Sequence, residues 1–266
     1  MININQYQSS LFTVLLVLMS MVCNSQSIVN TEKLFTNNGE GLGVSSELSG
    51  SSISGNASVL LLEYGLNFYY KNDKHYLRLL SGGEYINEDN EEVSNSLFTQ
   101  FRYNYLINEK SRLFAFTQVQ SNAILLFEQR LLAGGGYRRN IIDIKKDSSV
   151  RYELDLSAGV MQEKEVLNRT DLPISEKYNT NSTRSIFSLV GIIDVIDKFT
   201  IVNTTYFQQY LGNFQDFRLL NETNLMVQIN KWLSISLDLE YRFDSEPPSI
   251  LKDRDFNTNL GLVFNL

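Results

Sequence analysis

Apolar and polar side chains alternate along much of the chain after residue 40. In residues 60–70 one face carries Leu60, Leu62, Tyr64, Leu66, Phe68 and Tyr70. Residues 150–160 and 233–243 repeat this pattern, and their opposite faces are polar. Soluble strands average about 5–6 residues, whereas a tilted strand needs about 9–11 to cross a bilayer. The length of these alternating segments therefore favours transmembrane strands.

Further segments are predicted as strands, although their alternation is weaker. They are residues 41–51, 75–86, 97–105, 112–120, 124–138, 186–195, 199–207 and 217–229. Residues 253–266 alternate clearly and form the last predicted strand. Residues 124–126 and 186–195 are continuous apolar runs, so their facing is ambiguous. We therefore expect an all-β fold, a transmembrane antiparallel β-barrel of about twelve strands, with ten or fourteen as the alternatives.

The connections between these segments mostly alternate between short and long. Short joins fall at 71–74, 108–111, 197–198 and 230–231, and long polar stretches at 52–58, 87–96, 162–183, 208–215 and 244–254. Outer-membrane barrels have short periplasmic turns and longer extracellular loops. The join at 119–122 is an exception because it is short, and the join at 140–149 because it is long.

The final strand carries a possible assembly signal in residues 259–266. Its apolar face holds Phe256, Thr258, Leu260, Leu262, Phe264 and Leu266. Residues 259–266 resemble the C-terminal insertion signal of outer-membrane barrels, although that signal usually ends in Phe. On this resemblance the barrel-assembly machinery is an expected partner, recognising Asn259, Gly261, Phe264 and Leu266.

The N-terminus predicts a secretory signal in residues 1–25. Residues 11–22 form an apolar stretch too short to span a bilayer as a helix, but no Lys or Arg precedes it. A retained membrane anchor is the alternative. Residues 26–40 are then a short periplasmic segment and residues 41–266 the barrel. Cleavage after Ser25 would remove Cys23, the only cysteine, so the mature chain would have no thiol chemistry.

Aromatic side chains cluster beside the short joins. Those around 71–74 and 108–111 are Phe68, Tyr69, Tyr70, Tyr76, Tyr103, Tyr105, Phe114 and Phe116. Transmembrane barrels carry aromatic girdles at both interfaces, so we expect these residues to form one of them. Aromatics packed inside a soluble sandwich are the alternative.

Several short motifs resemble one family of envelope proteins. They lie at residues 54–56 (SGN), 130–137 (RLLAGGGY), 156–160 (LSAGV), 241–248 (YRFDSEPP) and 252–253 (KD). With them, most of residues 41–266 resembles the uncharacterised family of salt-induced outer-membrane proteins. That family has no established activity. The resemblance implies a barrel in the outer membrane of a Gram-negative cell, but no reaction.

The net charge of the chain limits the kinds of molecule that it is expected to bind. The net charge of −7 argues against nucleic acid, and outer-membrane lipid and lipopolysaccharide are the expected surroundings. The acidic run at 88–92 fits a solvated loop better than a divalent-cation site near lipopolysaccharide, because it lacks EF-hand ligand order.

No residue is assigned a catalytic, cofactor-binding or metal-binding role, and no cofactor is expected. A barrel lipid hydrolase would need a Ser–His pair, but His75, the only histidine, lies at the predicted periplasmic end.

Charged residues on the polar faces are expected to point into the lumen. They are Arg102, Glu128, Arg130, Arg151, Glu153, Asp155, Asp238, Glu240 and Arg242. Opposite charges either pair and fill the interior or line a water-filled pore, and we favour a mostly occluded lumen because the signs are interspersed.

The leading function is therefore an envelope or permeability protein that passes small solutes or ions. The alternatives are an extracellular binding module using residues 162–183 and 244–254, and a lipid hydrolase.

Overall fold

The computed structural model describes residues 40–53, 59–89, 91–146, 150–170, 172–195 and 198–265. The predicted signal peptide at 1–25, most of the segment at 26–40, the motif at 54–56 and Leu266 lie outside these residues. Those predictions stay predictions.

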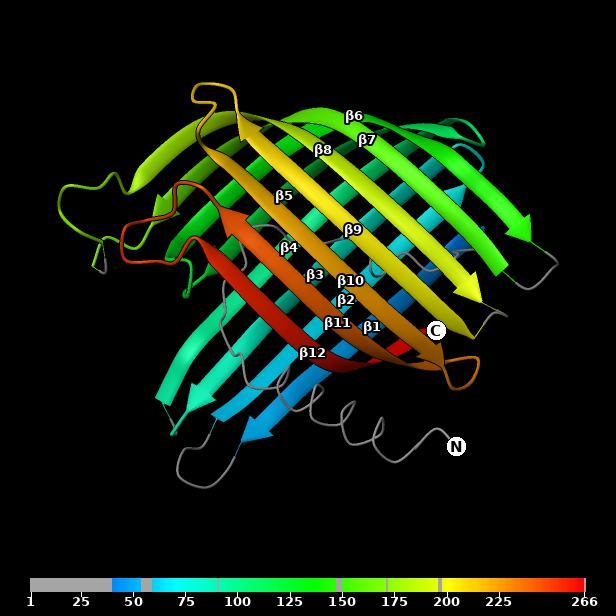
Figure 1. The fold of residues 1–266 in the computed structure, drawn as a ribbon, viewed down its shortest axis with the longest axis horizontal. Coiled ribbons are helices and arrows are strands. Elements are labelled where there is room, and N and C mark those ends of the chain that lie inside the picture. The colour runs from blue at the N-terminus through cyan, green and yellow to red at the C-terminus, as the bar shows by residue number, and fades with distance from the viewer. Residues whose placement is uncertain are drawn as a thin grey trace, which may run out of the picture.

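The described residues form a closed barrel of twelve antiparallel strands (Figure 1). The strands are β1 (Gly41–Ile53), β2 (Val59–Asn72), β3 (His75–Glu88), β4 (Glu91–Asn108), β5 (Ser111–Asn122), β6 (Phe127–Lys146), β7 (Val150–Leu167), β8 (Asn179–Val195), β9 (Phe199–Tyr210), β10 (Phe217–Gln228), β11 (Leu233–Asp244) and β12 (Arg254–Asn265). Each pairs with its neighbours in sequence, and β1 pairs with β12 to close the sheet. This seam pairs Ser45–Ser49 with Gly261–Asn265 and makes the sheet a closed barrel, the form in which strands can span a bilayer.

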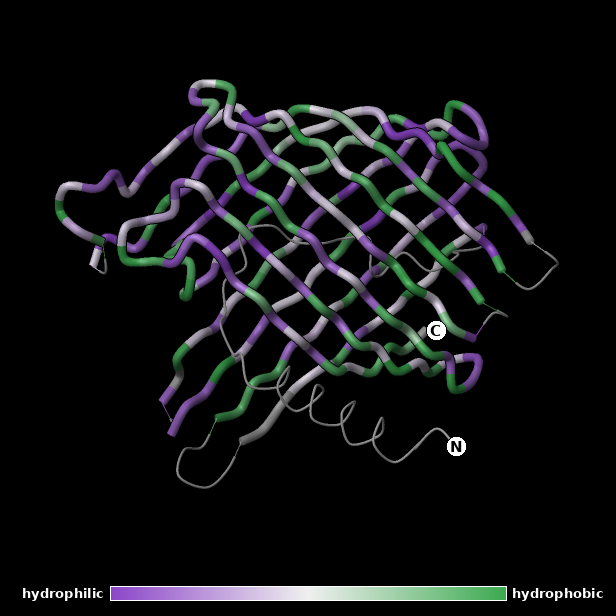
Figure 2. The backbone as a smooth tube through the Cα atoms, in the orientation of Figure 1, coloured by the Kyte–Doolittle hydropathy of each residue, from purple (hydrophilic) through white to green (hydrophobic). Residues whose placement is uncertain are grey.

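The barrel buries polar side chains and exposes apolar ones, the reverse of a soluble domain. Arg130 and Glu163 are 0% exposed in the interior, whereas Leu48 and Phe68 are about half exposed on the outside. Figure 2 shows the resulting alternation along the strands. This pattern confirms the predicted transmembrane antiparallel β-barrel. In the described part of the chain, no helix is long and apolar enough to cross a membrane.

Several strands extend beyond the sequence prediction. β7 continues to Leu167 and β8 starts at Asn179, so the loop predicted at 162–183 is wrong at both ends and shrinks to 168–178. β6 continues through residues 140–146, and residues 123–126 form a turn instead of the predicted start of this strand. The loop predicted at 87–96 is also wrong, because β3 continues to Glu88 and β4 starts at Glu91, which leaves only residues 89–90 between them.

One end of the barrel carries only short joins, whereas the other carries the long loops at 168–178, 211–216 and 245–253 together with short joins at 89–90 and 123–126. The exception at 140–149 disappears, but the join after β5 remains short. We name the two ends the short-turn end and the loop end.

Glycines allow the close approach of β6 and β7. Gly136 lies directly opposite Gly159, and a Cβ on Gly159 would stand 2.3 Å from the carbonyl oxygen of Gly135. A side chain there would collide with backbone. The glycine-weighted motifs at 130–137 and 156–160 thus meet at one place in the sheet.

The predicted aromatic girdle forms only in part. Phe68 and Tyr70 are exposed near the short-turn end, and the single tryptophan, Trp232, lies at the same end. The prediction is wrong for Tyr76 and Phe114, which are buried in the barrel interior, and for Phe116, which lines a cavity there. Strand alternation points these three side chains inward, so closeness to a turn did not decide their facing.

Candidate functional site: the barrel lumen

Most of the charged residues predicted to face the lumen do so. Arg102, Arg130, Asp238 and Arg242 are buried, and Arg151, Glu153, Asp155 and Glu240 are partly buried. The prediction is wrong for Glu128, which is exposed. The pairing of β6 with β7 is irregular between Phe127 and Gln129, so Glu128 falls outside the regular inward alternation.

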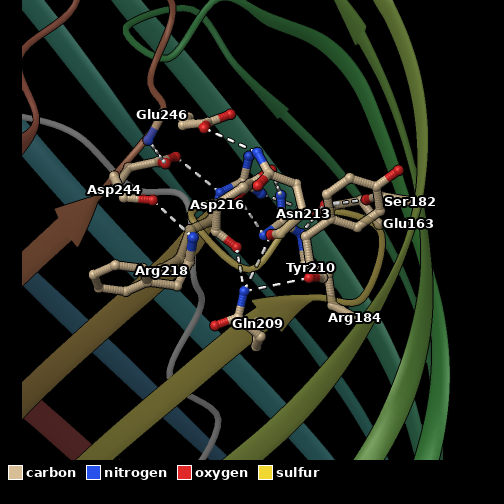
Figure 3. Close-up of polar contacts among 12 residues, drawn as sticks. Glu163, Ser182, Arg184, Gln209, Tyr210, Asn213, Asp216, Arg218, Asp244 and Glu246 are labelled. Atoms are coloured by element: carbon tan, nitrogen blue, oxygen red, sulfur yellow. Dashed lines mark hydrogen bonds and ion pairs between the residues drawn. The ribbon is translucent and has the colours of Figure 1, made fainter.

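A buried carboxylate, Glu163 on β7, organises the lumen near the loop end (Figure 3). It accepts hydrogen bonds from Arg130, from Arg184 Nε at 2.7 Å and from Arg218 Nη1 at 3.0 Å. The Ser182 hydroxyl donates a further bond of 3.0 Å. Three guanidinium groups from three different strands therefore converge on one carboxylate.

The arginines around Glu163 also bind further carboxylates. Arg184 forms a bidentate pair with Asp216, with bonds of 2.7 and 3.0 Å. Arg218 reaches Glu165 at 2.9 Å and Asp244 at 2.8 Å. We call this group the ionic network; its members are Arg130, Glu163, Glu165, Arg184, Asp216, Arg218 and Asp244. Buried charges need such pairing, so the network ties five strands together across the interior.

Sequence reasoning identified only Arg130 and missed the other six members of the ionic network, which are Glu163, Glu165, Arg184, Asp216, Arg218 and Asp244. The first two were assigned to a loop. Their signal was present, because the inward polar face of β7 continues at the same period of two from Arg151 to Glu165.

A cavity of about 500 Å³ opens above the ionic network at the loop end. Arg184, Arg218 and Tyr210 are in its lining, as are residues of the loop between β11 and β12. In that loop, side-chain hydrogen bonds from Arg254 lower the pKa of Asp253 below its usual range. The cavity therefore presents charges of both signs to anything that enters.

Two loops cover one side of this mouth. The described part of the β7–β8 loop packs Leu172 against a cluster formed by Leu125, Leu126, Phe127 and Leu167, and Leu251 joins from the β11–β12 loop. The Ser249 hydroxyl donates a hydrogen bond to Glu176, which links the same two loops. The mouth is thus shaped by loops that contact each other.

Deeper in the lumen the open spaces are small. A cavity of about 70 Å³ is lined by carboxylates of β1, β2, β3, β10 and β11. A second, of about 60 Å³, is lined by Arg102, Phe114, Phe116 and neighbouring side chains. Arg102 stacks over the Phe114 ring at 4.9 Å. The wide mouth therefore leads to a narrow, largely filled interior.

Nearer the short-turn end, Asp155 forms ion pairs with two arginines. Arg112 lies 3.3 Å from its carboxylate and Arg138 2.7 Å. Asn140 donates a third hydrogen bond of 2.9 Å. Opposite charges pair here as they do in the ionic network.

His75 begins β3 at the short-turn end, where it is exposed. Its Nδ1 lies 2.8 Å from the hydroxyl of Tyr103, and its ring packs edge-on against Tyr105. The hydroxyl next to the His75 imidazole therefore belongs to Tyr103, one of the residues predicted to form the aromatic girdle. Among the described residues, no group of three His, Cys, Asp or Glu is arranged to hold a metal ion.

Two solved structures that share this fold are a porin and an outer membrane channel. The NanC porin aligns over 84% of this chain and all of its own, with 8% identity and a TM-score of 0.50. An outer membrane channel from Pseudomonas putida F1 aligns over 90% of this chain and all of its own, with 11% identity and a TM-score of 0.50. At these identities the likeness establishes the fold.

No curated protein matches this chain. The family model described as "Protein of unknown function, DUF481" matches residues 46–266, which span β2 to β12 and most of β1. The chain therefore belongs to the DUF481 family.

Proposed function

We propose that this protein is an outer-membrane channel for small solutes or ions. The observation that carries the proposal is a polar lumen that narrows from a mouth of about 500 Å³ to spaces of about 70 and 60 Å³. Twelve strands make a barrel wider than the eight-stranded kind, which side chains fill, and narrower than porins of 16–18 strands. The filled interior favours ions and very small solutes over sugars.

In this proposal the short-turn end faces the periplasm and the loop end faces outward, as in other outer-membrane barrels. The start of β1 and the end of β12 then lie on the periplasmic side. Residues 1–25 would direct export and be cleaved. Asn259, Gly261, Phe264 and Leu266 would be read by the barrel-assembly machinery, and the apolar outer face would contact lipid and lipopolysaccharide. The family resemblance adds that expression rises with external salt, which transcript measurements test.

Single-channel recording in planar bilayers tests the proposal directly. The folded protein should produce discrete current steps in potassium chloride, with conductance far below that of wide porins because the lumen is narrow. The control is the same preparation heat-unfolded in detergent, which should give none. Current steps no more frequent than in this control would overturn the proposal.

A second candidate function is ligand binding by the extracellular loops. The contact between Ser249 and Glu176 and the packing of Leu251 give the mouth a defined shape. Deleting residues 169–177, which leaves both flanking strands intact, should then abolish binding to whole cells or surface glycans without changing conductance. Binding retained by this deletion would reject the candidate.

A further inference from the structure

Five carboxylates from five strands line one small cavity of the lumen. They are Glu47 of β1, Glu63 of β2, Glu84 of β3, Glu222 of β10 and Glu240 of β11. All five line the cavity of about 70 Å³, and the cationic side chain in this lining is Arg242. We call these five glutamates and Arg242 the acidic constriction. Its carboxylates outnumber its guanidinium by five to one, whereas the ionic network has four carboxylates to three guanidiniums.

The strand register pairs these carboxylates with each other. Glu63 lies directly opposite Glu84 between β2 and β3, and Glu222 lies directly opposite Glu240 between β10 and β11. Like charges directly opposite on one face of a sheet destabilise it. Two such pairs therefore face one small cavity in a barrel that elsewhere pairs opposite charges.

Neutral groups hold several of these carboxylates in place. Glu63 accepts hydrogen bonds from Ser49 at 3.1 Å and from Asn259 at 3.0 Å. Ser236 donates to Glu47 at 3.2 Å, and Asn257 to Glu240 at 3.2 Å. These neutral donors hold the carboxylate oxygens in position but do not neutralise their negative charge. Arg242 adds a guanidinium at 2.6 Å from Glu240.

Glu84 offers the acidic constriction an oxygen that could bind a further positive group. This side chain is 3% exposed, and its Oε1 has no hydrogen-bond partner among the described residues. The charged groups that act on it are Glu63, Glu240 and Arg242. A buried carboxylate oxygen without a partner carries a desolvation cost that a bound cation would remove.

We propose that the acidic constriction binds small monovalent cations and makes the channel selective for cations over anions. This inference rests on the channel function proposed above. Rings of Asp and Glu are the usual cation filters of channels, and carboxylate oxygens suit hard cations such as Na⁺ and K⁺. Conduction requires that each cation be held weakly enough to pass on, so we expect weak binding at this site.

Reversal potentials across a potassium chloride gradient test the selectivity. In the wild type we expect potassium to permeate about tenfold better than chloride, which corresponds to about 1.4 kcal/mol. The double substitution Glu63→Gln with Glu84→Gln should bring this ratio close to one, because it removes one like-charge pair and keeps the side-chain shapes. Glu128→Gln is the matched control, since it removes an exposed carboxylate that does not line the acidic constriction. It should leave the ratio unchanged.

The outcomes separate this inference from the channel function. A wild-type channel that conducts without preferring cations overturns the inference and leaves the channel. A barrel that does not conduct overturns the channel function, and cation binding is then measured through thermal unfolding in detergent. Potassium should raise the Tm of the wild type above its value in choline at equal ionic strength, and Glu63→Gln with Glu84→Gln should abolish the difference. Equal Tm values in the two salts would refute the site.

Discussion

Replacing Glu163 by Gln tests whether the ionic network stabilises the barrel. The substitution keeps the side-chain shape and removes the carboxylate on which Arg130, Arg184 and Arg218 converge. Breaking a buried ion pair from one side costs about 3–5 kcal/mol. The structure places this case at the lower end, because each arginine keeps another carboxylate.

Those remaining contacts set the expected magnitude. Arg184 keeps its bidentate pair with Asp216, Arg218 keeps Glu165 and Asp244, and Arg130 keeps Glu165 at 3.2 Å. Three guanidiniums then face three carboxylates, so we expect a loss of about 3 kcal/mol. Arg218→Gln instead leaves four carboxylates with two guanidiniums, so its loss should be larger, about 5 kcal/mol.

Urea titration of the barrel folded in lipid vesicles measures both losses. The single tryptophan, Trp232, provides the signal, because it is half exposed at the short-turn end and stacks on Phe264 at 6.3 Å. Its emission should change when unfolding moves it into water. Glu128→Gln should stay within about 0.5 kcal/mol of the wild type. A Glu163→Gln loss as small as this control, or greater than that of Arg218→Gln, would refute the reasoning.

Two further predictions concern facing and packing. Leu237→Arg places a charge on the lipid face and should cost about 2–4 kcal/mol near the midplane. Asp238→Asn should cost only about 1 kcal/mol, since the new amide oxygen can still accept the bond from Asn224; equal losses in the urea titration would contradict the assigned faces. Gly159→Ala should cost about 1–3 kcal/mol, because its Cβ would lie 2.3 Å from a backbone oxygen. Gly191→Ala, whose Cβ would meet its nearest atom at 3.9 Å, should not destabilise the barrel, and an equal loss would show that backbone contact is not the cause.

Alternation predicted the strands well because each face of a membrane strand meets a different solvent. Neighbouring residues such as Leu237 and Asp238 point to lipid and to the lumen respectively, so apolar and polar side chains alternate with a period of two along the sequence. All twelve strands were identified, including β12, whose pattern was the clearest near the C-terminus. The alternation gave the wrong facing for Glu128, because the register of the β6–β7 pairing shifts between Phe127 and Gln129.

Strand ends were predicted less well. The polar segment at 162–167 looked like loop sequence, but it is strand, because the β7 and β8 ladder continues past the apolar band. Its outward side chains, such as Gln162 and Lys164, are exposed and polar. Hydropathy therefore marked where the apolar band ends, and backbone pairing marked where the strand ends.

The chain's own pattern of side chains thus specified the antiparallel barrel and the inward or outward facing of residues in its clearly alternating strands. It did so because those properties depend on neighbours one or two positions apart. Which inward residues meet was decided only when the sheet closed. Closure set the register that places Glu63 opposite Glu84, and it brought Arg130, Arg184 and Arg218 from separate strands onto Glu163. Contacts across a barrel join residues far apart in the chain, and no local pattern encodes them.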